Sequence, residues 1–232
     1  MAAETTAITL LWGQRTAPKR GPKPTLSLDT IAAVGIEIAD ADGLAAVTMQ
    51  RVAERLGVTK MALYRYVPGK TELVALMVEL ALGEPPPLTA VADDWRPKLD
   101  TWARQMFDRF WAHPWALEAT VGARAIGPNE LGWLEQATAA LTGTGLAGSE
   151  MLDVAVTIIG HVRTIAQQAA PAPADAPEQA MGNTMGALLT GREHRFPALV
   201  AALADPAGKD QALGFGLQCI LDGVESLINR RN

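Results

Sequence analysis

The stretch that most constrains the fold is TMQRVAERLGVTKMALYRYVPGK, residues 48–70. It predicts two short helices joined by a tight turn, because Thr48 and Thr59 are each placed to cap a helix and a glycine interrupts the helical pattern between them. In the second helix, Leu63 and Val67 are the only strongly apolar anchors, and they are spaced four residues apart. The other side chains of this helix are mostly tyrosines, cations and a methionine, so we expect one of its faces to meet a partner.

Two short helices joined by a glycine-containing turn form a helix-turn-helix, whose second helix can enter the DNA major groove. At the start of the second helix, Lys60 can donate to guanine, and Met61 or Ala62 can pack on a thymine methyl group. Phosphate contacts suit the surrounding hydroxyl groups and a cation, namely those of Thr48, Thr59, Tyr64, Tyr66 and Lys70. The alternative interpretation is an ordinary helical hairpin with solvated cations and half-buried tyrosines.

The rest of the chain has helical periodicity and almost no strand signals, which predicts an all-α protein. The expected helices are 27–42, 49–56, 60–66, 71–82, 95–112, 129–142, 150–169, 177–191, 196–204 and 209–229. The segment GEPPPLTAVADD at 83–94 breaks the pattern and marks the expected domain boundary. We therefore predict a flexible basic arm at 1–25, a three-helix DNA-binding domain with the helix-turn-helix at 26–83, and a larger helical domain at 84–232.

The formal net charge of −5 is unevenly distributed along the chain. Residues 1–83 hold nine Lys/Arg against eight Asp/Glu, whereas residues 84–232 hold eleven against seventeen. In the arm, four proline-separated cations (Arg15, Lys19, Arg20 and Lys23) stand against Glu4 alone. This asymmetry indicates that only the N-terminal part meets a polyanion. The arm is either a minor-groove ligand or a solvated basic tail.

Several classes of protein are not supported by the sequence. Cys219 is the single cysteine, so no internal disulfide or cysteine-based metal cluster is expected, and we expect its thiol to be buried and inert. No histidine has a partner four residues away, and no catalytic motif or convergent carboxylate pair is present. We predict a non-enzymatic protein without metal or cofactor. Without a signal sequence or a long apolar run, we expect it in the cytoplasm, away from the membrane.

The segment VTMQRVAERLGVTKMALYRYVPGKTELV resembles the DNA-binding region of the TetR family of bacterial transcriptional regulators. The matching positions are Thr48-Met49, Ala53, Leu56-Gly57-Val58, Leu63-Tyr64, Tyr66, and Lys70 before Glu72-Leu73. The resemblance implies that Gln50, Lys60 and Met61 face bases. It also implies that the phosphate contacts come from Thr48, Thr59, Tyr64, Tyr66 and Lys70. Arg65 is a further DNA-binding candidate, although it stands where members of the family vary widely.

The second domain resembles the ligand-binding half of the branch that includes the tetracycline repressor, through HPW at 113–115, GPN at 127–129 and GLAGSE at 145–150. The resemblance implies a small-molecule pocket and a dimer interface. The apolar candidates for the pocket wall are Trp102, Met106, Phe110, Trp111, Trp115 and Trp133. The polar candidates are Arg124, His161 and Arg163. The alternative for each of these residues is a place in the core. Tetracycline with Mg²⁺ is not expected, because the segment after the fourth helix, 83–87, lacks the histidine of that repressor.

Together these features predict a homodimeric repressor that binds a palindromic operator in double-stranded DNA and is released by a small apolar or aromatic effector. The long helices 150–169 and 209–229 are expected to form the dimer interface, because they hold more apolar residues than one core needs. The residues that motivate this are Val154, Ile158, Ile159, Val162, Leu217, Ile220 and Leu221. The alternatives are a helix-turn-helix regulator with no inducer, and an α-helical ligand carrier or enzyme.

Overall fold

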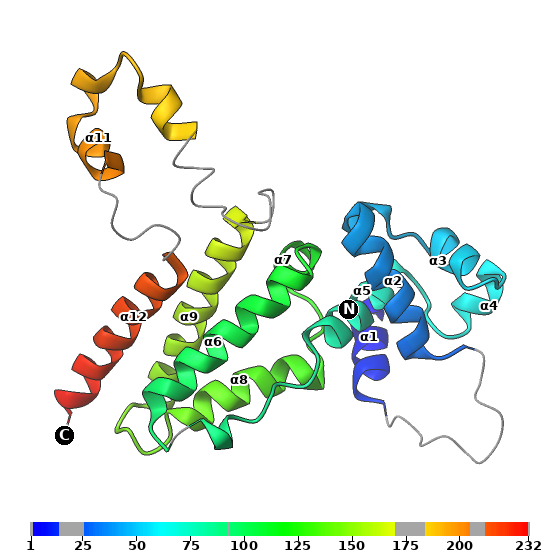
Figure 1. Cartoon of the computed structure of the whole chain (residues 1–232). Coiled ribbons are helices and arrows are strands. Elements are labelled where there is room, and N and C mark those ends of the chain that lie inside the picture. Colours follow the sequence, from blue (N-terminus) through cyan, green and yellow to red (C-terminus); the bar gives the residue numbers. More distant parts are fainter. Residues whose placement is uncertain (1, 14–25, 92, 170–183, 205–211, 232) are drawn as a thin grey trace.

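The computed structural model of the chain describes residues 2–13, 26–91, 93–169, 184–204 and 212–231. All regular structure in these ranges is helical, as predicted (Figure 1). A small N-terminal group of helices lies at one end of the molecule, and the longer helices α6, α8, α9 and α12 form the body (Figure 1).

The first helix, α1 (Ala2–Trp12), corrects the expectation of a flexible arm over 1–25. It packs along α5, and Ala7 and Leu11 are buried in the core. The hydrophobic residues Ala7, Leu10 and Leu11 give this short segment the apolar face that a docked helix needs. The basic residues 14–25 lie outside the described residues.

The N-terminal domain continues with α2 (Leu28–Asp42), η1 (Leu44–Ala46), α3 (Met49–Arg55), α4 (Lys60–Tyr64) and α5 (Lys70–Leu82). The predicted cap of α2 is confirmed, because the Ser27 hydroxyl accepts the backbone N–H of Thr30 at 3.1 Å. Gly43 ends α2 with a φ of +81°, a left-handed value that glycine tolerates without strain. Gly57 has a φ of +66° at the sharp turn between α3 and α4.

The body contains η2 (Leu88–Ala90), α6 (Trp95–Ala112), α7 (Trp115–Ala119), α8 (Pro128–Ala140), α9 (Gly148–Ala169), η3 (Glu193–Arg195), α11 (Pro197–Ala204) and α12 (Ala212–Asn229). The long predicted helices are confirmed to within a few residues. The short α7 is not among the predicted helices, because the HPW sequence at 113–115 indicates a break between helices. The predicted helix at 177–191 is described only from residue 184, where 184–189 is helical.

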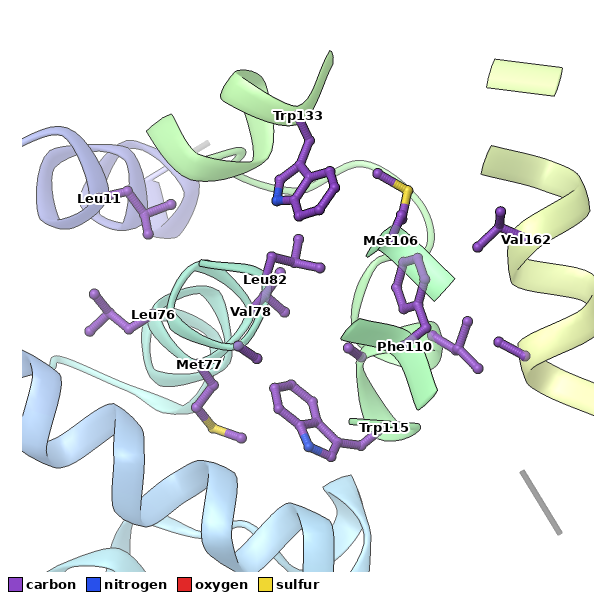
Figure 2. Close-up of a cluster of buried hydrophobic side chains, with 14 of the residues drawn as sticks. Leu11, Leu76, Met77, Val78, Leu82, Met106, Phe110, Trp115, Trp133 and Val162 are labelled. Carbon is purple, nitrogen blue, oxygen red and sulfur yellow. The ribbon is translucent and has the colours of Figure 1, made fainter. Parts of the chain in front are cut away.

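Among the described residues, one hydrophobic core extends through both parts of the molecule, from Ala7 in α1 to Ile228 in α12. Helix α5 is central to it, because it packs on α1 and α2 on one side and on α6, α7 and α8 on the other. Figure 2 shows Leu76, Met77, Val78 and Leu82 of α5 projecting in several directions into this core. Any movement of α5 must therefore be shared between the two parts of the molecule.

Candidate DNA interface and candidate ligand cavity

The helix-turn-helix is held together by the residues that the sequence indicated. The Thr48 hydroxyl accepts the backbone N–H of Arg51 at 3.1 Å, and the Thr59 hydroxyl accepts that of Ala62 at 3.2 Å. The two threonines thus cap α3 and α4. A capping hydroxyl still has its own hydrogen to donate, so both threonines keep the capacity to bind a phosphate oxygen.

Helix α4 and the residues just after it have one side buried in the core and the other exposed to solvent. Leu63 and Val67 are fully buried, which confirms their predicted role as anchors. Met61 is 72% exposed, and Tyr64 and Tyr66 are exposed on the same short segment. This combination leaves polar and aromatic side chains at the surface, while Leu63 and Val67 hold the segment in the core.

Besides the two capping threonines, the candidates Gln50, Lys60 and Lys70 also have partners within the chain. The amide of Gln50 donates to Glu54 at 2.6 Å, and the Lys60 ammonium lies 5.7 Å from the centre of the Tyr64 ring. The Lys70 ammonium donates to the Leu44 carbonyl at 3.4 Å. These contacts are exposed and weak, so DNA can replace them at little cost. Arg65 is exposed as well.

A cavity of about 240 Å³, partly open to solvent, lies in the body and is bordered by α5, α6, α8, α9 and the segment that follows α7. It is lined by Leu82, Met106, Phe110, Thr120, Arg124, Ile126, Glu130, Leu131, Trp133, Leu134, Val156, Ile159 and Arg163. Figure 2 shows Met106 and Phe110 of α6 and Trp133 of α8 beside Leu82 at the end of α5. Its volume is near the lower limit of about 300 Å³ for ligand pockets, so a larger ligand must displace flexible side chains such as Met106.

Polar groups occur on one side of this cavity. Arg124 forms a two-point ion pair with Glu130. Arg163 donates to the Thr120 hydroxyl and to the Leu117 carbonyl, both at 2.5 Å, and its guanidinium lies 5.2 Å from the centre of the Phe110 ring. Burial lowers the pKa of Arg163 from its ordinary value, and the positive charge of Arg124 lowers it further. The cavity is therefore apolar with a few fixed hydrogen-bonding groups, which is typical of a small-molecule site.

The structure brings five of the nine pocket candidates together at this cavity: Met106, Phe110, Arg124, Trp133 and Arg163. Trp102 does not line it; this side chain is fully buried and donates to the Trp133 carbonyl at 2.9 Å. Trp111 stacks on Phe107 instead, with 5.6 Å between ring centres. These two tryptophans therefore pack between and along helices and do not form the wall of the cavity.

Trp115 and His161 also lie away from the cavity, in contacts between helices. The Trp115 indole donates to the Asp40 carboxylate at 2.7 Å, which joins α7 to α2. His161 contacts the Leu213 carbonyl through Nε2 at 3.0 Å, and its ring fills the space beside Gly216. His161 therefore helps to pack α9 against α12.

Sequence reasoning missed the cavity residues Leu82, Thr120, Ile126, Glu130, Leu131, Leu134, Val156 and Ile159. The sequence criterion for the wall favours aromatic residues, whereas much of the wall is aliphatic. Aliphatic residues at helical spacing look the same whether they face a core or a cavity.

Three sets of hydrogen bonds connect the body to the N-terminal domain, including Gly83 at its C-terminal end. The Glu79 carboxylate in α5 accepts the backbone N–H of Asn129 in α8 at 2.7 Å. The Trp133 indole donates to the Gly83 carbonyl at 3.1 Å. His113 contacts the Asp40 carboxylate at 2.9 Å, beside the Trp115 bond. The cavity wall and the helix-turn-helix are thus joined through α5 and α2.

The chain combines an exposed, capped helix-turn-helix with a helical domain that contains an apolar cavity, and one core joins the two. This combination is typical of a DNA-binding regulator with a ligand-binding domain. Family comparisons agree: residues 31–77 match the family of bacterial regulatory proteins named tetR, and residues 87–228 match the tetracyclin repressor-like C-terminal domain. The chain belongs to the TetR family and is a DNA-binding transcriptional repressor.

The relatives include the HTH-type transcriptional repressor DrrR1 of Streptomyces coeruleorubidus, which is 35% identical over 96% of this chain and 86% of its own length. Apo ActR of Streptomyces coelicolor superposes with a TM-score of 0.75 at 21% identity, over 91% of this chain and all of ActR. ActR in complex with actinorhodin superposes with a TM-score of 0.69 at 25% identity, over 88% of this chain and 97% of ActR.

Two other expectations are resolved by these findings. The prediction of a regulator rather than an enzyme is confirmed by the family. The expectation of a buried Cys219 is wrong, because this thiol is exposed on α12. Among the described helices, none has the length and apolar character needed to cross a membrane.

Proposed function

We propose that the chain acts in the cytoplasm as a homodimer on a palindromic operator, and that an apolar aromatic molecule in the 240 Å³ cavity releases it from the DNA. The observation that carries this proposal is the Glu79–Asn129 hydrogen bond, because it connects the wall of the cavity to α5. The solved complex of ActR with actinorhodin, an aromatic polyketide, supports the chemical class of the ligand.

The release mechanism depends on the distance between the two recognition helices of the dimer. Two half-sites are bound only when these helices lie about one DNA turn apart, roughly 34–36 Å. A ligand that displaces Leu131 or Leu134 shifts α8, and the Asn129 contact transmits that shift to Glu79 in α5. The ligand can weaken DNA binding only by as much as it prefers the shifted shape.

The outward faces of α9 and α12 are proposed as the dimer interface. Among the residues that motivated this interface, Val154, Ile158, Val162, Leu217 and Leu221 are buried in the chain's own core, so they do not form the contact surface. The exposed faces of the two helices carry instead Val156, Thr157, Gly160, Phe215, Cys219 and Gly223. Small residues such as these glycines allow close approach of helices from two subunits in a four-helix bundle.

The direct test is fluorescence anisotropy of labelled DNA from the region upstream of the chain's own gene, titrated with a set of aromatic polyketides. We expect the chain to bind this DNA with a dissociation constant in the nanomolar range. At least one compound should weaken that DNA affinity about tenfold or more, on the order of the usual allosteric coupling. Leu134→Trp fills the cavity and should still bind DNA while losing the response. Glu135→Trp, on the exposed side of α8, is the matched control and should respond normally.

Two outcomes would contradict this proposal. An unchanged response in Leu134→Trp would place the effector elsewhere. Tight DNA binding that no compound alters would favour the alternative of a regulator without an inducer.

A further inference from the structure

We propose that the chain has a second small-molecule site, separate from the cavity described above, for a planar apolar molecule with one acidic group. The site is a hollow of about 550 Å³ between α1, α5 and the segment that follows α7. Its lining includes Ala7 of α1, Lys70, Thr71 and Ala75 of α5, and Ala123 and Arg124 of the segment after α7. Its existence is independent of the proposed function, but its effect on DNA binding rests on that function.

The walls of this hollow suit a flat apolar body. Five of the lining residues are alanines and two are valines, so most of the surface is smooth, and the long side chains are those of Lys70 and Arg124. One broad side is provided by α5, through Val74, Ala75 and Val78. The volume lies well inside the range of about 300–1,000 Å³ that is typical of ligand sites.

The charge at the rim indicates an acidic group on the ligand. Lys70 forms no ion pair with any described carboxylate, and the one hydrogen bond of its ammonium to a described residue is the 3.4 Å contact with the Leu44 carbonyl. Arg124, the other cation, is already neutralised by Glu130. The available charge is therefore that of Lys70, and the Thr71 hydroxyl beside it can donate a hydrogen bond to the same acidic group.

Helix α1 closes one side of the hollow and is held there by a specific contact. The Trp12 indole donates to the Ile126 carbonyl at 2.9 Å, and the α1 residues Ala7 and Leu11 are buried in the core. Ile126 and Arg124 also line the first cavity. The segment 124–126 thus separates the two spaces, so a molecule in one of them contacts residues that shape the other.

A ligand at this second site would act directly on the DNA-binding part of the molecule. Lys70 is the phosphate contact expected at the start of α5. An acid bound to its ammonium competes with the DNA phosphate for the same charge. We therefore expect occupancy of this site to lower DNA affinity for all sequences alike and to weaken its salt dependence.

The site is tested without DNA, by calorimetric titration of the full chain with anthraquinone-2-carboxylate, a planar three-ring acid. We expect two molecules bound per chain. Ala75→Trp on α5 and Ala123→Trp on the segment after α7 each fill the second hollow, so each variant should bind one molecule, in the first cavity. Leu134→Trp fills the first cavity, so it should also bind one molecule, in the second hollow. Ala123 is exposed, so its variant keeps the test valid if Ala75→Trp does not fold.

Lys70→Gln provides the chemical part of the test. It should weaken the binding that survives in Leu134→Trp by about two- to fivefold, as expected for a partly exposed ion pair, and should not change binding of the corresponding carboxamide. One molecule per wild-type chain that is lost only in Leu134→Trp would overturn the second site while leaving the proposed function intact. Unchanged stoichiometry in both tryptophan variants of the second hollow would also overturn it.

Discussion

Glu79 in α5 and Asn129 in α8 hold each other by two hydrogen bonds between the two parts of the molecule. The Glu79 carboxylate accepts the backbone N–H of Asn129 at 2.7 Å, and the Asn129 side chain donates to the Glu79 carbonyl at 2.9 Å. The carboxylate thus lies at the N-terminal end of α8, where the helix dipole stabilises negative charge. This geometry gives the cavity wall a firm connection to the helix that leads to the DNA-binding domain.

Glu79→Ala should lower the free energy of unfolding by about 1–3 kcal/mol, because it leaves the part-buried N–H of Asn129 without its acceptor. Urea denaturation at a fixed protein concentration measures the loss. Glu79→Gln is the control, since its amide oxygen can still accept this bond, and it should lose less. Equal losses in the two variants would show that the charge of Glu79 matters more than the hydrogen bond.

Gly127→Ala should destabilise the same contact from the other side. A Cβ atom at Gly127 would collide with the Glu79 carboxylate, so this carboxylate would have to move. Overpacking of this kind costs about 1–3 kcal/mol in the free energy of unfolding. Gly148→Ala is the matched control, because a Cβ atom there meets nothing within 4 Å. A thermal unfolding midpoint that falls no further for Gly127→Ala than for Gly148→Ala would contradict the tight fit.

The sequence predicted the helices of this chain well because each long helix has its own periodicity and its own boundary residues. Ser27, Thr48 and Thr59 act on residues three positions away, so their capping roles can be read locally. The same holds for Leu63 and Val67, whose burial follows from helical spacing. The fold of the helix-turn-helix and its exposed side were therefore predictable from about twenty consecutive residues.

The ligand cavity was only partly predictable, because it depends on contacts between residues far apart in the chain. Trp115 and Trp133 are both buried tryptophans, yet one donates to Asp40 and the other lines the cavity. Nothing in their local sequence distinguishes these roles. Helix α1 was missed for the same reason: its stability comes from packing on α5, which is about sixty residues away in the sequence.

Trp115→Phe should weaken communication between the body and the DNA-binding domain. The substitution keeps an aromatic ring in the core but removes the N–H that donates to Asp40 at 2.7 Å. We expect about 1 kcal/mol less unfolding free energy and a smaller effect of ligand on DNA affinity, with ligand affinity in the absence of DNA almost unchanged. Anisotropy titrations with and without ligand measure the coupling, and a coupling equal to that of the wild type would exclude this role.

Lys60→Ala should reduce sequence preference, whereas Lys70→Ala should reduce affinity for every sequence. Lys60 is at the start of the exposed helix α4, where a base-edge contact is worth about 1–3 kcal/mol of discrimination. Lys70 begins α5 and is expected on a phosphate, so its loss should lower the salt slope by about one. Competition between operator and scrambled DNA at several salt concentrations separates the two effects. Parallel losses on both DNAs for both variants would remove the distinction.

Gly160→Leu combined with Gly223→Leu should convert the proposed dimer to monomers without unfolding the chain. Both glycines are exposed, and a Cβ atom at either position meets nothing within 4 Å in the single chain, so leucine there should project into solvent in the monomer and strengthen helix propensity. Across a close helix contact between two subunits, the same side chains would collide. Sedimentation velocity at micromolar concentration should show half the mass, circular dichroism should show an intact helical fold, and operator binding should fall because one subunit holds only one half-site. Ala139→Leu, on the exposed surface of α8, is the control and should remain dimeric. A double variant that stays dimeric would place the interface on another face.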